Sequence, residues 1–164
     1  MNPRPTPESI AASAQRVRAS GRAPTVAVVL GSGWDGIAET VDAPLDIAYA
    51  ELPAFPALGV AGHAGTLRLG RLGDAEVALL RGRQHAYESG DAAAMMGAIR
   101  TLAAIGCATV VLTNAAGSLD PAMRPGSLML IADHLNIAQR TPLHGEPGND
   151  RITLMVCSFD GPAG

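Results

Sequence analysis

The sequence predicts an α/β fold in which a mixed β-sheet is flanked by helices. Two runs, residues 25–30 and 109–113, are almost wholly apolar and rich in β-branched residues. Strands buried on both faces read as continuous apolar runs, so we expect these two to be central strands. A helical pattern precedes each run and a hairpin pattern lies between them. This alternation favours helices on both faces of one sheet.

The first elements are predicted in order along the chain. Thr6-Pro7-Glu8 begins a helix with a capping hydroxyl, a proline at the first helical position and an acid in the first turn. Gly21 ends that helix. We expect the strand at 25–30 next, then a short helix over 34–41 and a strand over 45–50.

The remaining elements begin with a hairpin. Residues 66–72 and 76–81 flank Gly73-Asp74, a turn sequence typical of paired strands. Residues 91–105 are expected to form a helix that starts near Asp91 and ends at Gly106. The strand at 109–113 follows, and residues 128–132 are a further strand candidate.

Composition excludes several classes of function. The chain has 164 residues, enough for one domain with a buried core, and its net charge is −3 with no lysine. A nucleic-acid binder would carry a basic face. The two cysteines lack metal-ligand spacing, no run is long enough to span a membrane, and the first 20 residues hold no apolar leader. We therefore expect a cytoplasmic protein with no metal and no nucleic-acid or membrane partner.

A glycine-rich loop follows the first strand and allows three interpretations. The residues from Gly31 to Gly36 fit the spacing of a dinucleotide-binding turn, and Glu51 lies where an acid would contact a ribose. Asp42-Ala43-Pro44, however, leaves room for only about two turns of helix. The second interpretation is a loop that holds one oxyanion through backbone N–H groups and the hydroxyl of Ser32. The third is a tight turn with no ligand.

The segment from Gly82 to Glu88 is the most informative. In an extended loop, Arg83, His85 and Tyr87 would share one face because side chains alternate. Arginine offers a planar fork suited to phosphate, histidine a hydrogen-bond donor, and tyrosine a flat surface for a sugar. Glu88 would orient His85 if the loop folds back. An exposed polar loop without a ligand is the alternative.

Two further loops hold candidate groups. His63 lies between glycines in Gly62-His63-Ala64-Gly65, either at a cleft or simply solvated. Asn114 and Ala115 follow the second apolar strand, where small residues let a ligand lie against the backbone and the Ala115 amide can donate. The loops at 31–33, 81–88 and 114–117 each follow a predicted strand, so we expect them to meet at one edge of the sheet.

Together these segments resemble the trimeric purine nucleoside phosphorylases. The resemblance rests on Gly31-Ser32-Gly33, Gly62-His63-Ala64-Gly65, Gly82-Arg83-Gln84-His85-Ala86-Tyr87-Glu88, Thr113-Asn114-Ala115-Ala116-Gly117-Ser118-Leu119 and the run from Pro125 to Asn136, in that order. It implies the nucleoside phosphorylase fold, a homotrimer, and phosphorolysis of purine ribonucleosides to free base and ribose 1-phosphate. Inorganic phosphate is the co-substrate, and no cofactor is implied.

The resemblance also implies a role for individual residues. Arg83 and His85 would be catalytic, Tyr87 would contact the ribose, and Glu88 and Asn114 would play supporting roles. The phosphate contacts would come from Ser32, His63, Arg83, His85 and Ala115.

The resemblance covers part of the family's length. Family members continue past residue 164 with the groups that grip the purine, so we expect the chain to be incomplete at its C-terminal end. We assign residues 1–150 to the phosphorylase-like domain and residues 151–164 to a tail that does not resemble the family. The alternative function is a non-catalytic remnant that binds phosphate at most or serves as an interaction surface.

Overall fold

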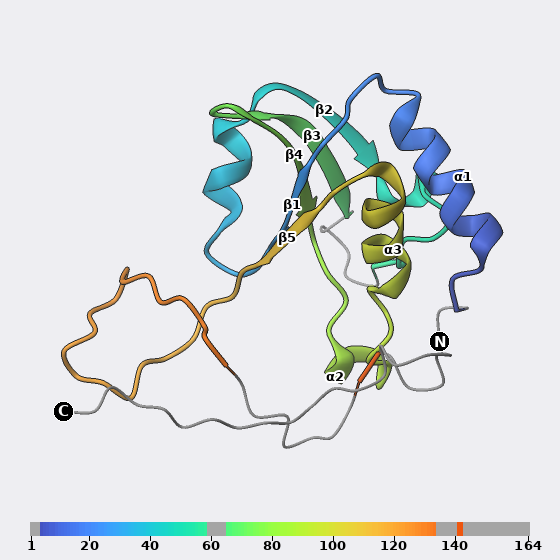
Figure 1. Ribbon diagram of the computed structural model, residues 1–164. Coiled ribbons are helices and arrows are strands. Elements are labelled where there is room, and N and C mark those ends of the chain that lie inside the picture. Colours follow the sequence, from blue (N-terminus) through green and yellow to red (C-terminus); the bar gives the residue numbers. More distant parts are fainter. Residues whose placement is uncertain (1–3, 59–64, 134–140, 143–164) are drawn as a thin grey trace. The chain divides into compact units, whose positions relative to one another are not determined.

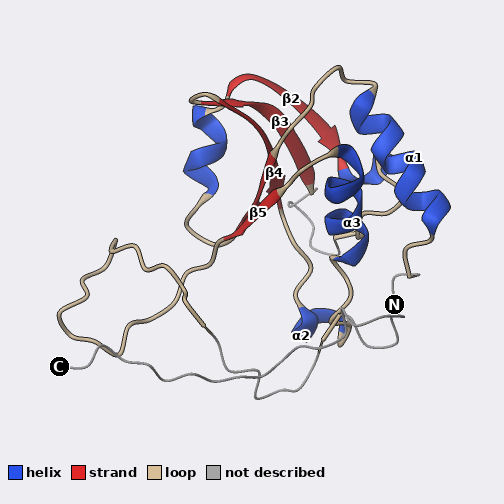
Figure 2. Cartoon of the chain, in the orientation of Figure 1, coloured by secondary structure: helices blue, strands red, loops and turns tan. Residues whose placement is uncertain are grey.

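The computed structural model describes residues 4–58, 65–133 and 141–142. The chain divides into two units, residues 1–115 and 116–164. All helices and strands of the described residues lie in the first unit (Figures 1 and 2). No helix in the described ranges is long and apolar enough to cross a membrane.

The first unit is built on one five-stranded mixed sheet, with strand order β2-β3-β4-β1-β5. The strands β4 and β5 each pair in parallel with β1, whereas β2, β3 and β4 pair antiparallel. The strand bounds are Val26–Leu30 (β1), Asp42–Ala48 (β2), Thr66–Leu72 (β3), Ala75–Arg81 (β4) and Thr109–Leu112 (β5). The predicted fold class is confirmed, as are the central strand and the hairpin around Gly73.

Helices cover both faces of this sheet. The helices α1 (Pro7–Arg18) and α3 (Met96–Ile105) pack beside each other on one face, and the 3₁₀ helix η1 (Asp35–Thr40) covers the other (Figure 2). An apolar core lies on each face of the sheet, and alternate residues of β1 contribute to each. Val29 packs in the core on the side of α1 and α3, and Leu30 packs in the core on the side of η1. This two-sided burial explains the continuous apolar run in the sequence.

The start of α1 agrees with the predicted cap. The Thr6 hydroxyl accepts a hydrogen bond from the Ser9 backbone N–H at 3.2 Å, and Ser9 Oγ in turn accepts from the Thr6 N–H at 3.0 Å. These bonds satisfy N–H groups that have no partner within the helix. Gly21, at a φ of +75°, follows the helix in the left-handed conformation expected of such a glycine.

Four expectations need correction. The helix α3 begins at Met96 and not near Asp91, whose carboxylate instead accepts from the Ala93 N–H in a local turn. The strand β2 begins before residue 45 and includes Pro44, which an edge strand tolerates. The strand β5 forms as predicted but is exposed, because β1 is its one partner among the described strands. Residues 128–132 are exposed and form no strand, since no described segment pairs with them.

Two short helices complete the first unit. They are η2 (Tyr49–Glu51), which follows β2, and α2 (Ala86–Ser89), which Gly90 ends at a φ of +72°. In the second unit the described residues form turns, one of them closed by the Met123 N–H on the Asp120 carbonyl at 3.1 Å.

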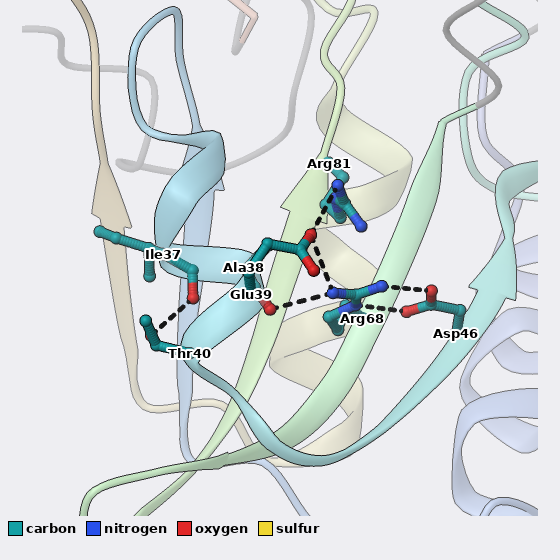
Figure 3. A network of polar contacts seen from close by, with 7 residues as sticks. All are labelled: Ile37, Ala38, Glu39, Thr40, Asp46, Arg68 and Arg81. Carbon is teal, nitrogen blue, oxygen red and sulfur yellow. Dashed lines mark hydrogen bonds and ion pairs between the residues drawn. The ribbon is translucent and has the colours of Figure 1, made fainter.

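A network of ion pairs ties η1 to the sheet (Figure 3). Arg68 on β3 donates to both carboxylate oxygens of Asp46 on β2 at 2.8 Å and forms an ion pair with Glu39 at 3.3 Å. Glu39 also pairs with Arg81 at 3.2 Å. Since Arg81 is the last residue of β4, the network fixes the strand end that leads into the segment containing Arg83.

We expect Asp46 to make stability depend on pH. The hydrogen bond from Arg68 holds the pKa of the Asp46 carboxyl below its ordinary value of 3.8. A group whose pKa is lower in the folded state contributes fully above its unfolded pKa and loses that contribution as the pH falls through the folded pKa. Asp46→Asn should therefore lower the free energy of unfolding at pH 7, and its difference from wild type should shrink below about pH 4.

Urea unfolding at pH 7, 5 and 3 measures this dependence. Asp35→Asn is the control, because Asp35 is exposed and no ion pair is found for it among the described residues. A deficit for Asp46→Asn that stays constant over the whole pH range would contradict the assignment.

Candidate functional site

The first unit brings together the loops that follow β1, β4 and β5. These three strands are mutually parallel, and the register places Leu30 beside Arg81 and Val29 beside Leu112. Their carboxyl ends therefore lie at the same edge of the sheet (Figure 1). This is the place where open α/β sheets bind ligands, as the sequence predicted.

Thr113 connects two of the three loops. Its buried hydroxyl accepts a hydrogen bond from the Gly31 N–H at 2.8 Å and donates one to the Val29 carbonyl at 2.9 Å. The Thr113 side chain is thus satisfied in both directions, and the first residue of the glycine loop is fixed against the loop after β5.

Arg83 connects the third loop to the same residue. Its Nη1 donates to the Thr113 carbonyl at 2.8 Å. One end of the guanidinium is therefore held on the backbone beside the glycine loop. A guanidinium carries five N–H donors, so this bond leaves others for a bound anion.

Gly31 is required because two backbone segments approach closely there. A Cβ atom at this position would lie 2.4 Å from the Thr113 carbonyl oxygen and 2.9 Å from the Asn114 Cα. No side chain fits at that distance. The glycine loop and the loop after β5 are therefore in direct backbone contact.

His85 and Tyr87 lie together, although not as an alternating strand face. Tyr87 belongs to the short helix α2, so the expectation of an extended segment was wrong. The two rings nevertheless stack with centroids 4.9 Å apart and planes 13° apart. Tyr87 is 81% exposed, which leaves its outer surface open to a ligand.

The other predicted donors are partly described. Ser32 and Ala115 are exposed, and neither the Ser32 hydroxyl nor the Ala115 N–H has a hydrogen-bond partner among the described residues. The carbonyl of Asn114 accepts from the indole of Trp34 at 3.1 Å. His63 lies outside the described residues, as does the side chain of Glu88.

Three structural residues near the site were not predicted from sequence. They are Thr113, Trp34 and Tyr49, whose hydroxyl donates to the Gly82 carbonyl at 2.8 Å. Burial raises the pKa of the Tyr49 phenol well above its ordinary value, so the group remains a donor. The signal for Thr113 was a hydroxyl that directly follows an apolar strand.

An apolar cavity of about 410 Å³ in this unit is lined by residues that include Tyr49, Phe55 and Leu58. Of the predicted site residues that the structure describes, none lines it. The candidate site is therefore the loop cluster around Thr113 and not this cavity.

The sequence also matches a known protein family. The family model that describes the phosphorylase superfamily matches residues 25–161 of this chain. The chain belongs to the phosphorylase superfamily. This match confirms the family resemblance drawn from the motifs.

Relatives in the phosphorylase superfamily share much of the sequence. Purine nucleoside phosphorylase of Mycobacterium leprae is 45% identical over 121 residues, which are 73% of this chain and 45% of the relative. The purine nucleoside phosphorylase of Mycobacterium tuberculosis is 41% identical over 148 residues, 88% of this chain and 55% of that protein. The chain spans about half the length of the curated relatives it matches.

A solved phosphorylase has a similar fold. The crystal structure of purine nucleoside phosphorylase from Schistosoma mansoni, in complex with acetate, superposes with a TM-score of 0.68 at 27% identity. The match covers 76% of this chain and 46% of the other.

We expect Thr113→Val to loosen the junction of the loops. Valine keeps the shape of threonine but leaves the buried Gly31 N–H without an acceptor, which costs about 1–3 kcal/mol. Urea unfolding measures the loss. Thr109→Val, at an exposed position of β5, is the matched control and should stay within about 0.5 kcal/mol of wild type. Equal effects of the two substitutions would show that the Thr113 hydroxyl does not hold the loops.

Proposed function

We propose that this chain carries the phosphate side of a purine nucleoside phosphorylase site. The reaction would be phosphorolysis of a purine ribonucleoside to the free base and ribose 1-phosphate. The observation that supports it most is the junction at Thr113, where Arg83 and the glycine loop contact one residue. The relatives at 41–45% identity are purine nucleoside phosphorylases.

The chemistry requires a positioned phosphate. As the bond between C1′ and the purine nitrogen breaks, positive charge develops on the ribose, and a phosphate oxygen then bonds to C1′ while the base leaves with a proton. A dianion held beside the ribose stabilises that charge, and positioning removes much of the entropic cost. No metal or organic cofactor enters this scheme, and phosphate is the co-substrate.

Each predicted residue has a place in the scheme. Arg83 would bind phosphate through the N–H groups that Thr113 leaves free, and His85 would donate to the same anion. Tyr87, stacked on His85, would contact the ribose. Asn114 and Glu88 would support the loops. Further phosphate donors would be Ser32, His63 and the Ala115 amide.

The family extends the proposal to assembly and location. Because the chain resembles the trimeric purine nucleoside phosphorylases, we propose that it forms a homotrimer. We also propose that the enzyme is cytoplasmic. We propose phosphate binding without turnover as the alternative function. It would use the same loops.

Two measurements on the full chain test these functions. Release of hypoxanthine from inosine is followed in a coupled assay with and without phosphate, and phosphate binding is measured by isothermal titration calorimetry. Phosphate-dependent release supports the phosphorylase. Binding without release supports the non-catalytic alternative. Absence of both would overturn the assignment of the site.

A further inference from the structure

Trp34 makes two contacts that join the glycine loop to the loop after β5. Its backbone N–H donates to the Gly31 carbonyl at 3.1 Å and closes the turn on which Ser32 stands. Its indole Nε1–H donates to the Asn114 carbonyl at 3.1 Å. The ring itself packs against the apolar cluster that includes Leu30 and Ala38. Packing therefore fixes the apolar part of the ring, and the indole N–H points at a single acceptor.

The second contact fixes a peptide plane. In a trans peptide the carbonyl of one residue and the N–H of the next point in opposite directions. Because the Asn114 carbonyl is directed at Trp34, the Ala115 N–H is directed away from it. That N–H has no partner in the described part of the chain.

The neighbouring peptide is fixed in the same way. The Thr113 carbonyl accepts from Arg83 Nη1. Two successive carbonyls after β5 are therefore held by side chains from the two other loops, one by Arg83 and one by Trp34. Donors that are fixed before a ligand arrives bind an anion without a further ordering cost.

We propose that Trp34 is a positioning residue that sets the Ala115 N–H for a phosphate dianion and couples it to the turn of Ser32. This inference rests on the proposed function, since it takes inorganic phosphate as the ligand. It assigns a role to a side chain that does not itself touch the ligand. Without the indole donor, the Asn114–Ala115 peptide can rotate, and the Ala115 N–H is no longer held in one direction.

The sequence offers a direct probe, because Trp34 is the only tryptophan. A ¹H–¹⁵N correlation spectrum of the full chain therefore contains a single indole cross-peak. Titration with inorganic phosphate should move that peak, because an anion on the Ala115 N–H polarises the peptide whose carbonyl accepts from the indole. The shift gives the phosphate Kd without requiring turnover.

Trp34→Phe keeps an aromatic ring and removes the donor. We expect its phosphate Kd, measured by calorimetry, to rise about five- to tenfold, in keeping with the loss of one net hydrogen bond. Incorporation of benzothienylalanine at position 34 replaces the indole nitrogen with sulfur and keeps the shape of the ring, so it should produce the same rise even if the phenylalanine variant folds poorly. Arg71→Ala, an exposed position on β3, is the control and should leave the Kd unchanged.

The outcomes separate this inference from the function on which it rests. If wild type binds phosphate, and the phenylalanine and benzothienylalanine variants bind it with the same Kd as wild type, Trp34 does not position the Ala115 N–H. The proposed function then still stands. A fall in thermal stability without a change in Kd would mean the same. If wild type shows neither an indole shift nor calorimetric binding, the phosphate site fails and this inference fails with it.

Discussion

Arg83→Ala should abolish measurable phosphate binding and, with it, any phosphate-dependent release of base. Charge-assisted hydrogen bonds from a guanidinium are each worth about 1.5–3 kcal/mol, so removing a bidentate contact should weaken binding by two orders of magnitude or more. Arg83→Lys should lose most of the affinity as well. A single ammonium cannot reach the Thr113 carbonyl and present a planar fork to the anion at the same time.

Calorimetric titration with phosphate measures both substitutions, and Arg71→Ala corrects for the loss of one positive charge. Circular dichroism and urea unfolding establish that the variants are folded. Phosphate affinity within twofold of wild type for Arg83→Ala would remove the guanidinium from the site and leave the loop cluster without its main cation.

The central sheet could be predicted because burial restricts composition. Both faces of β1 are covered, so only apolar residues fit at positions 26–30, and the pattern is visible without knowledge of the neighbours. The same reasoning wrongly predicted that β5 is buried. Its sequence is equally apolar, yet it stands at an edge of the sheet with Leu112 69% exposed. The amino-acid composition of a strand indicates that it can be buried, and not whether neighbouring elements cover it.

The arrangement of the loops at the candidate site could be predicted in part. The convergence of three loops followed from the parallel strand ends, because that rule depends on topology alone. The conformation of the segment containing His85 and Tyr87 did not follow, since the four-residue helix α2 is too short to show a helical period. The hydrogen-bond partners of Thr113 and Trp34 could not be predicted either, although a hydroxyl directly after an apolar strand does single out Thr113. Each bond joins residues about 80 positions apart, and no local pattern encodes such a contact.

Gly31→Ala should be the most damaging of the small substitutions in the loops. Its Cβ would lie 2.4 Å from the Thr113 carbonyl oxygen, which is the atom that accepts from Arg83. The two backbones must separate to admit the methyl group, and overpacking of this kind costs about 1–3 kcal/mol or more. Because the displaced carbonyl orients the guanidinium, we also expect phosphate affinity to fall at least tenfold.

Gly36→Ala supplies the matched control in the same loop region. Apart from the adjoining backbone, no atom of the described residues lies within 4 Å of a Cβ at Gly36, and its φ is not positive. Alanine should be neutral or slightly stabilising there, because it lowers the entropy of the unfolded chain. Urea unfolding and phosphate titration of the pair compare the same chemical change at a closed and an open position. Equal tolerance of the two alanines would show that the glycine loop and the loop after β5 are not in contact, and the common site around Thr113 would then be lost.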